Sequence, residues 1–212
     1  MPNRHPHAPV VAIDIDATIA QYHSHFLNFA RLWTGRDLEM NWEGVAGSFS
    51  KAMGMSKRSY RESKLAYRQG GMKRSLPVFE GARDLTVDIR KAGVQVWICT
   101  TRPYLRLDNV DPDTRHWLRR NGIQYDGFLY GERKYQDLVK IVGKERVVVV
   151  MDDLPEQIEA ANRLGLKTIL RYGAHNAWYI EQPHCKDQEV TMTLGNAKSR
   201  ILSLIEERKN GK

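Results

Sequence analysis

Four aspartates of this chain come directly after two strongly apolar runs. Asp14 and Asp16 follow Val-Val-Ala-Ile at residues 10–13, and Asp152 and Asp153 follow Val-Val-Val-Val-Met at residues 147–151. A single aspartate after a strand often does no more than cap the next helix. Four carboxylates brought together would repel one another unless a cation lay among them. A hard divalent ion with oxygen ligands, typically Mg²⁺, suits such a set.

A third apolar run ends in hydroxyl side chains. Residues 94–99 are followed by Thr100, Thr101 and Arg102. Ligands of an open α/β sheet bind outside the carboxyl ends of its strands. The three runs therefore predict one site, to which each contributes polar residues at the same edge of the sheet.

The apolar runs also indicate which elements hold these residues. Continuous apolar runs predict strands buried on both faces, as in a parallel sheet covered by helices. Weaker strands are expected at residues 127–130 and 167–170, and an amphipathic helix near the C-terminus. Helical patterns that end at or near glycine occupy the intervals, at residues 81–92, 112–121, 134–142 and 155–164. The alternation predicts an α/β fold with a Rossmann-like doubly wound parallel sheet.

Residues 19–76 interrupt this alternation, because they contain helical patterns and no convincing strand. We expect a small helical cap subdomain here, inserted into a core domain made of residues 1–18 and 77–212. An apolar stripe near the start of the cap includes Phe26 and Trp33, which we expect to belong to the cap's own core.

Four segments resemble the motifs of the haloacid dehalogenase-like superfamily, in that family's order. Residues 14–18, Asp-Ile-Asp-Ala-Thr, resemble its D-x-D-x-T motif, although Ala17 stands where the family usually has glycine. Residues 98–101 resemble the second motif, Lys134 the lysine of the third, and residues 151–155 the acidic fourth. The resemblance covers residues 10 to about 170, which is most of the chain.

This resemblance implies a Mg²⁺-dependent phosphatase that works through an aspartyl-phosphate. It gives Asp14 the role of nucleophile, and Asp16 that of the acid and base for leaving alcohol and water. Thr100 would donate to the phosphoryl oxygens, and Lys134 would neutralise the negative charge that gathers there. Lys134 opens its helix at the expected edge of the sheet, and this position favours it over other lysines of the segment.

The resemblance also implies ligands for metal and phosphate. Mg²⁺ would be held by the Asp14 side chain, the Asp16 backbone carbonyl and Asp152, with Asp153 as an alternate ligand. Arg102 and Arg133 stand beside motif residues, where they would contact the phosphate or the leaving group, or lie solvated at the surface.

Two further segments resemble the 5′(3′)-deoxyribonucleotidase branch. They are residues 76–82, Leu-Pro-Val-Phe-Glu-Gly-Ala, and residues 98–103, Ile-Cys-Thr-Thr-Arg-Pro. They imply a (deoxy)nucleoside monophosphate as substrate, with Thr101 on the phosphate and a cap aromatic over the base. The base, the sugar, the 5′ or 3′ position and the oligomeric state stay open.

Other functions remain as alternatives. Thr101 and Arg102, followed by an Asp- and Arg-rich stretch to Trp117, resemble the phosphatase half of polynucleotide kinase-phosphatases. A formal charge of +8 would suit nucleic acid. A receiver-type phosphoacceptor domain places its acidic residues differently and has no cap, and a binding module without catalysis would not need every chemical position filled.

The bulk composition predicts a soluble cytoplasmic protein. The polar residues 1–7 lack the apolar stretch of a signal peptide, and the longest apolar run, residues 147–151, is too short for a bilayer. Cys99 and Cys185 have no CxxC spacing, which favours a reducing compartment. His175, His184 and Cys185 have no matching ligand set in the sequence, and we interpret them as structural or incidental.

Overall fold

A six-stranded parallel sheet forms the centre of the molecule, with strand order β3-β2-β1-β4-β5-β6. The computed structural model describes residues 7–103 and 105–211, so most of the polar N-terminal segment lies outside the described residues. The expected α/β fold with a Rossmann-like doubly wound sheet is confirmed. The strands are β1 (Val10–Ile13), β2 (Gln95–Thr100), β3 (Gly127–Tyr130), β4 (Val147–Asp152), β5 (Thr168–Arg171) and β6 (Val190–Thr191).

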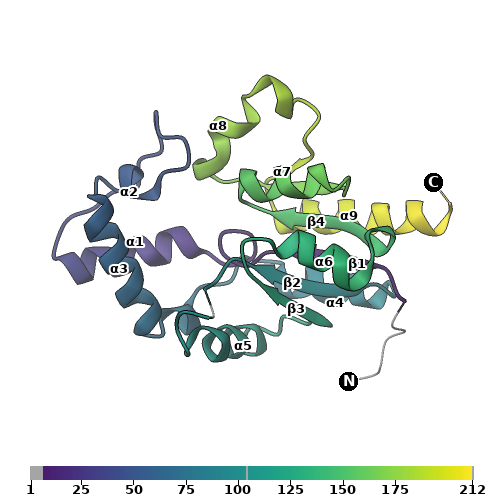
Figure 1. The fold of residues 1–212 in the computed structure, drawn as a ribbon, viewed down its shortest axis with the longest axis horizontal. Coiled ribbons are helices and arrows are strands. Elements are labelled where there is room, and N and C mark those ends of the chain that lie inside the picture. The colour runs from purple at the N-terminus through teal and green to yellow at the C-terminus, as the bar shows by residue number, and fades with distance from the viewer. Residues whose placement is uncertain (1–6, 104, 212) are drawn as a thin grey trace.

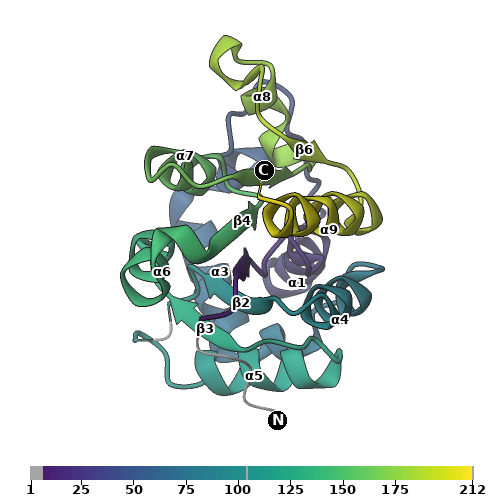
Figure 2. The ribbon, with the colours of Figure 1, turned by 90° about the vertical axis from the view of Figure 1, so that its right-hand side faces the viewer.

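Helices cover both faces of the sheet, as Figure 2 shows. One face packs against α4 (Ala82–Lys91), α5 (Val110–Arg120) and α9 (Leu194–Lys209). The other packs against α6 (Lys134–Val142) and α7 (Pro155–Arg163). Side chains alternate along a strand, so that in β1 Val11 and Ile13 enter the first core cluster while Val10 and Ala12 enter the second. This explains why β1 and residues 147–151 of β4 are apolar throughout.

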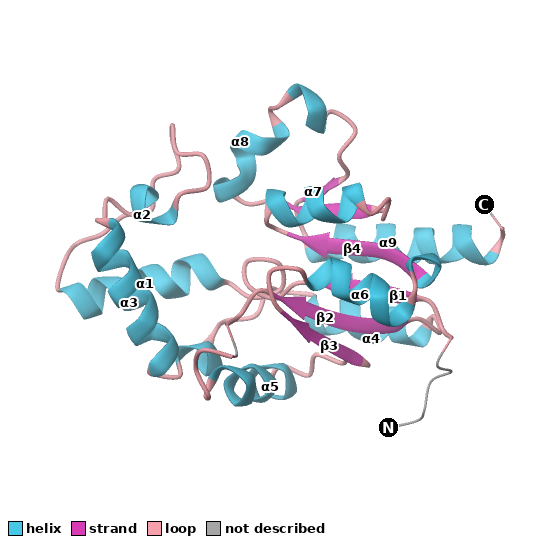
Figure 3. Cartoon of the chain, in the orientation of Figure 1, coloured by secondary structure: helices cyan, strands magenta, loops and turns pink. Residues whose placement is uncertain are grey.

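Residues 19–76 connect β1 to α4 and lie beyond the carboxyl ends of the strands (Figures 1 and 3). We refer to this segment as the cap. Its helical elements are α1 (Tyr22–Thr34), α2 (Phe49–Ala52), α3 (Lys57–Gln69) and the 3₁₀ turn η1 (Met72–Ser75).

The cap core differs from the prediction at one aromatic residue. Phe26 is fully buried, as expected, and it packs against Tyr22 and Tyr67. Trp33 was expected beside it but is 59% exposed. It lies in the last turn of α1, where its indole stacks on Phe29 and otherwise faces solvent. The prediction for Trp33 was wrong because helical periodicity gives the face of a residue and not how far along the helix the neighbouring elements extend.

The C-terminal region completes the sheet and one helical layer. The short strand β6 closes the sheet, and the expected amphipathic helix is α9, which packs on α4 and β4. Short elements join these parts: η2 (Lys144–Arg146), η3 (Ala174–Asn176), α8 (Ala177–Ile180) and η4 (Pro183–Cys185). Of the helices in the described part of the chain, none combines the length and apolar character that a membrane crossing requires.

The turn after β1 contains a strained residue. Ala17 has φ +65°, and it is the one non-glycine residue with positive φ in the described ranges. Its N–H donates to the Ala20 carbonyl, which closes the turn at 2.9 Å. A side chain with a Cβ adopts this conformation at a cost of roughly 1–2 kcal/mol. The alanine that replaces the usual glycine of the motif is therefore accommodated with strain.

We predict that Ala17→Gly stabilises the protein, since glycine adopts positive φ without a Cβ clash. The free energy of unfolding should rise by about 1 kcal/mol, which corresponds to about 2–4 °C in Tm for a chain of this length. Thermal denaturation measures the change. Ala20→Gly is the matched control. It should lower the Tm, because Ala20 is buried and does not have a positive φ. A lower Tm for Ala17→Gly would contradict the strain at this turn.

Candidate active site

The carboxyl ends of β1, β2 and β4 meet the cap around a small cavity of about 110 Å³. The core residues that line it are Asp14, Asp16, Thr101, Arg102, Asp153 and Leu154. The cap residues that line it are Tyr22, His23, Phe49, Lys64, Arg68 and Lys73. Ligand pockets for molecules of drug size occupy roughly 300–1,000 Å³. The cavity in this arrangement therefore suits a phosphate group with a small substituent, and a larger ligand needs the cap to move outward.

Strand register brings two of the predicted aspartates together. β1 pairs directly with β4, with Ile13 opposite Met151, so the next residues in register are Asp14 and Asp152. Lys134, the first residue of α6, lies between them with its Nζ 2.6 Å from Asp14 Oδ1 and 2.6 Å from Asp152 Oδ2. All three side chains are buried. Tyr135 donates its hydroxyl to the same Asp152 oxygen and fixes that carboxylate further.

Asp153 is held by three partners from two parts of the chain, the loop after β1 and η3. The Thr18 hydroxyl donates to Asp153 Oδ1 at 3.1 Å, and the His175 Nε2 lies 2.8 Å from Oδ2. The Asn176 side-chain amide donates to the Asp153 backbone carbonyl at 2.8 Å. These contacts give the threonine of the first motif a structural role, because it links the loop after β1 to the loop after β4.

Asp16 belongs to a separate network. Arg102 binds it through two bonds, from Nη2 to Oδ1 at 2.6 Å and from Nε to Oδ2 at 3.1 Å. Lys73 of the cap donates to Oδ2, and its ammonium group lies over the Tyr22 ring, 4.1 Å from the centroid. Arg102 also donates to the Thr114 hydroxyl. A buried arginine fork on a carboxylate is a strong and geometrically specific pair.

The two networks have opposite electrostatics. Burial raises the pKa of Asp14 well above its ordinary value, and Asp152 and Asp153 add to this while Lys134 opposes it. Burial would also raise the pKa of Asp16, but Arg102 and Lys73 outweigh it and hold that pKa far below the usual range. The positive charge of Lys134 therefore does not balance the three carboxylates around Asp14, whereas Asp16 is fully compensated.

The residues around Asp14 fit a divalent metal ion. Carboxylate oxygens of Asp14, Asp152 and Asp153 lie within 4.8 Å of one another, and all three side chains are buried. Lys134 is the cation bonded to Asp14 and Asp152, so two negative charges remain uncompensated in this group if His175 is neutral. Oxygen-only ligands and an excess of negative charge are what Mg²⁺ requires.

The remaining predicted residues differ in their positions. Thr101 lines the cavity, whereas Thr100 ends β2 and is buried, with its hydroxyl accepting a long 3.4 Å bond from the Arg102 N–H. Arg102 lines the cavity but is bound to Asp16. Arg133 precedes α6, is exposed, and does not belong to the cavity lining.

Several contributors were not anticipated from the sequence. Lys73, Lys64 and Arg68 come from the cap, where nothing in the local pattern separates them from its other basic residues. His175 was interpreted as structural, yet it reaches Asp153 and packs edge-on against His23, with ring centroids 4.3 Å apart. Its signal was its place shortly after β5, since the carboxyl end of that strand faces the same edge.

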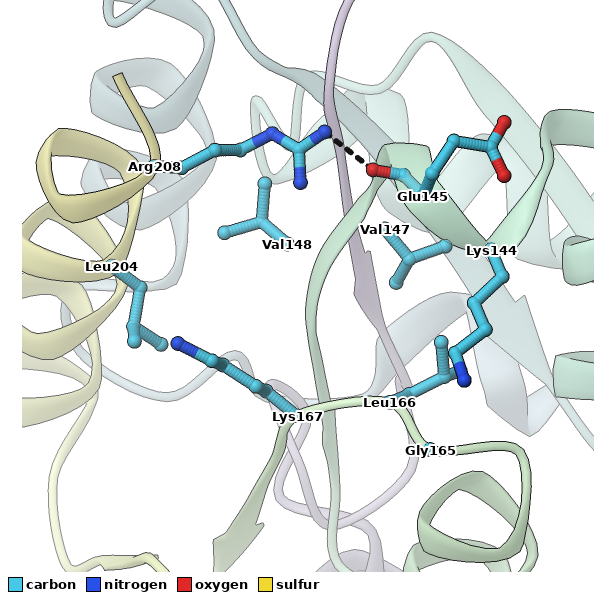
Figure 4. A pocket seen from close by; sticks show the side chains of 9 residues that line it. All are labelled: Lys144, Glu145, Val147, Val148, Gly165, Leu166, Lys167, Leu204 and Arg208. Atoms are coloured by element: carbon cyan, nitrogen blue, oxygen red, sulfur yellow. Dashed lines mark hydrogen bonds between the residues drawn. The ribbon is translucent and has the colours of Figure 1, made fainter. Parts of the chain in front are cut away.

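A larger hollow of about 390 Å³ lies at the opposite edge, near the start of β4. Figure 4 shows Lys144, Lys167 and Arg208 around it, with Arg208 donating to the Glu145 backbone carbonyl. Its lining has one acidic residue, Glu145, and no nucleophile paired with a base. Because ligands of such sheets bind at the carboxyl ends of the strands, the smaller cavity is the candidate site.

Solved structures share this architecture. A haloacid dehalogenase-like family hydrolase from Streptococcus pneumoniae is 14% identical, with 92% of this chain and 99% of that one covered and a TM-score of 0.62. The chain has the haloacid dehalogenase-like fold. CbbY from Rhodobacter sphaeroides, solved with xylulose-(1,5)bisphosphate, is 15% identical over 88% of this chain and 95% of its own, with a TM-score of 0.58.

A third solved structure with this fold is named as a kinase and not as a hydrolase. Protein tyrosine kinase A from Mycobacterium tuberculosis is 20% identical over 92% of this chain and 98% of its own, with a TM-score of 0.64. No protein-family model and no curated protein matches the chain. At these identities the likeness establishes the fold, and the reaction must be argued from the residues at the site.

We predict opposite stability effects for the two aspartates of the first motif. In metal-free protein at pH 8, Asp14→Asn should raise the free energy of unfolding, because it removes a carboxyl group whose ionisation is opposed by burial and by Asp152 and Asp153. Asp16→Asn should lower it by about 3 kcal/mol, because it leaves Arg102 and Lys73 buried without their anion. Denaturant unfolding in the presence of a chelator measures both.

The gain from Asp14→Asn should depend on pH in a defined direction. Unfolded Asp14 ionises from about pH 4, whereas the folded side chain holds its proton to higher pH. The wild type therefore loses stability relative to the variant as the pH rises from 4 until the folded group ionises. An equal effect at pH 4 and pH 8 would contradict the raised pKa.

Proposed function

We propose that this protein is a Mg²⁺-dependent phosphatase that hydrolyses small phosphate monoesters through an aspartyl-phosphate on Asp14. The observation that carries the proposal is the buried arrangement of Asp14, Lys134, Asp152 and Asp153 beside a cavity closed by the cap. Mg²⁺ would be held by Asp14, Asp152 and the Asp16 backbone carbonyl, with Asp153 as an alternate ligand. Bound there, the ion would supply positive charge to the phosphoryl oxygens and orient them.

Different residues of the chain have separate roles in the displacement at phosphorus. Asp14 attacks phosphorus, the bond to the ester oxygen breaks, and an acyl phosphate forms that water can hydrolyse. Lys134 favours the ionised form of the attacking carboxylate, against the burial that raises its pKa, and stabilises the charge that develops on the phosphoryl oxygens. Thr100 ends the strand beside Asp14 and Thr101 follows it; both supply hydroxyl donors, and the cap excludes bulk water.

Proton transfer to the leaving alcohol is assigned to Asp16 together with Lys73. Asp16 is ionised at neutral pH because of its partners and so has no proton of its own to give. Lys73 donates to it, and burial lowers the pKa of this lysine to about 7. The pair can therefore hold one proton between Nζ and Oδ2, release it to the alcohol, and recover it from the water that attacks the acyl phosphate.

A nucleoside monophosphate is the substrate we propose within this class. His23 and Phe49 line the cavity, and Trp42 packs against both, so the cap offers aromatic faces that could cover a base. A nucleotide would require the cap to open beyond the arrangement described above. A cap over the site disfavours a polynucleotide end. Free, buried Cys99 and Cys185 agree with a cytoplasmic location.

We predict that the protein releases phosphate from an aryl phosphate with Mg²⁺ and does not after chelation. Asp14→Asn should reduce kcat by at least about 10³-fold, because it removes the nucleophile. Asp152→Asn should weaken the dependence on Mg²⁺ and abolish the rise in Tm that Mg²⁺ gives the wild type. Arg133→Gln is the control, since this exposed residue lies outside the cavity lining. Turnover that survives in Asp14→Asn would exclude the proposed mechanism.

A substrate panel tests the finer proposal. Nucleoside 5′- and 3′-monophosphates should give higher kcat/KM than the corresponding sugar phosphates, because a base can stack on the cap aromatics. Phe49→Ala should reduce this preference by about tenfold, within the range of base–aromatic stacking. Equal rates for nucleotides and sugar phosphates would rule out a nucleotide preference, and faster hydrolysis of a 3′-phosphorylated oligonucleotide would indicate a polynucleotide phosphatase.

A further inference from the structure

Two positive side chains of the cap face the cavity without an anionic partner. Lys64 and Arg68 lie one turn apart on α3, both are partly buried, and both line the cavity. In the described part of the chain, neither forms an ion pair, whereas Arg58 on the same helix is paired with Glu62. Lys64 instead lies over the Tyr60 ring, 5.3 Å from its centroid.

This arrangement costs the protein stability. Like charges four residues apart on a helix repel each other, and burial together with Arg68 lowers the pKa of Lys64 to about 8. The i, i+4 spacing places both groups on one helical face, and they meet the catalytic aspartates across one cavity. A bound anion would remove this electrostatic cost. Two cations exposed at the surface would not have it, because solvent would screen their charges.

The charge balance of the site leaves these two cations in excess. When Mg²⁺ is counted together with the charged groups at this edge other than Lys64 and Arg68, the total is one net positive charge. A phosphate monoester dianion changes this to one net negative charge, and Lys64 and Arg68 then add two positive charges. One further negative charge would restore balance. The charged groups counted with the metal are Asp14, Asp16, Asp152, Asp153, Lys73, Arg102 and Lys134.

Once the charge of Mg²⁺ is counted, neither cation is needed to compensate the core carboxylates. Arg102 and Lys73 occupy both oxygens of Asp16, and Lys134 bonds to Asp14 and Asp152. Lys64 and Arg68 come from the cap and therefore approach the cavity from the side that the leaving group would occupy.

We infer that Lys64 and Arg68 form a subsite for a second anionic group, a carboxylate or a phosphate, carried on the alcohol portion of the substrate. The inference rests on the proposed function, because it names the class of ester that the same site hydrolyses. On a nucleoside scaffold this class is the 3′,5′-bisphosphate, and on a two-carbon scaffold it is a phosphorylated hydroxy acid. The two cap cations thus determine specificity, and the aspartates perform the chemistry.

The test compares two matched pairs of substrates in the Mg²⁺-loaded full chain. One pair is a nucleoside 3′,5′-bisphosphate and the corresponding 5′-monophosphate, and the other is 2-phosphoglycolate and 2-hydroxyethyl phosphate. The measured quantity is the ratio of kcat/KM within a pair. We expect a ratio of about ten or more in at least one pair for the wild type, since hydrogen bonds to charged groups contribute at about this level.

Variants of Lys64 and Arg68 test whether these two residues cause the preference for the substrate with a second anionic group. Lys64→Gln and Arg68→Gln should each lower the ratio about tenfold, whereas Lys64→Arg should retain it because the charge is kept. Arg61→Gln is the matched control, as it removes one positive charge from an exposed position of the same helix and should leave the ratio unchanged. Thermal denaturation of each variant shows that the fold is intact.

The outcomes separate this inference from the proposed function. Absence of Mg²⁺- and Asp14-dependent turnover of an aryl phosphate would overturn the proposed function and the subsite with it. Turnover of the aryl phosphate with ratios near one in both pairs would overturn the subsite alone. A preference that Lys64→Gln and Arg68→Gln leave intact would also overturn it, because the second anion would then bind elsewhere.

Discussion

The ion pairs that Lys134 makes with Asp14 and Asp152 are the interaction on which the candidate site depends. Two buried carboxylates at adjacent strand ends are unfavourable unless a cation lies between them. The helix that follows β3 begins at Lys134, and this places an ammonium group at the required point. The pairing of β1 with β4 brings the two carboxylates close enough to repel each other, and the lysine that begins α6 reduces this repulsion.

Lys134 does not compensate all of the negative charge at these strand ends, and this excess of negative charge bears on function. Asp153 adds a third buried carboxylate, which Thr18 and His175 position by hydrogen bonds. A protein that needed only a stable sheet would be better served by an apolar or fully compensated edge. Sites that perform chemistry often keep such unfavourable groups in place through many surrounding contacts. The strained backbone of Ala17, between Asp16 and Thr18, is a second cost at the same loop.

The sequence predicted what depends on local pattern. Apolar runs predicted β1 to β5, and the polar residues at their ends gave Asp14, Asp16, Thr101, Asp152 and Asp153 as candidate site residues, because parallel strands end at one edge. It did not predict the partner of Asp16 in the cap, since Lys73 is 57 residues away in the chain. Such a contact depends on how the cap packs, and local composition does not encode that packing. His175 was underestimated for the same reason.

The cap therefore does more than cover the site. Lys73 joins it to Asp16, and burial in the cap sets the pKa of this lysine near neutrality. Any outward movement of the cap that exposes Lys73 would return its pKa toward the ordinary lysine value and weaken its bond to Asp16. In the proposed mechanism, the protonation state of Asp16 and Lys73 is thus coupled to the position of the cap. Proton transfer would be most effective when the cap is closed, which is also when water is excluded from the phosphoryl group.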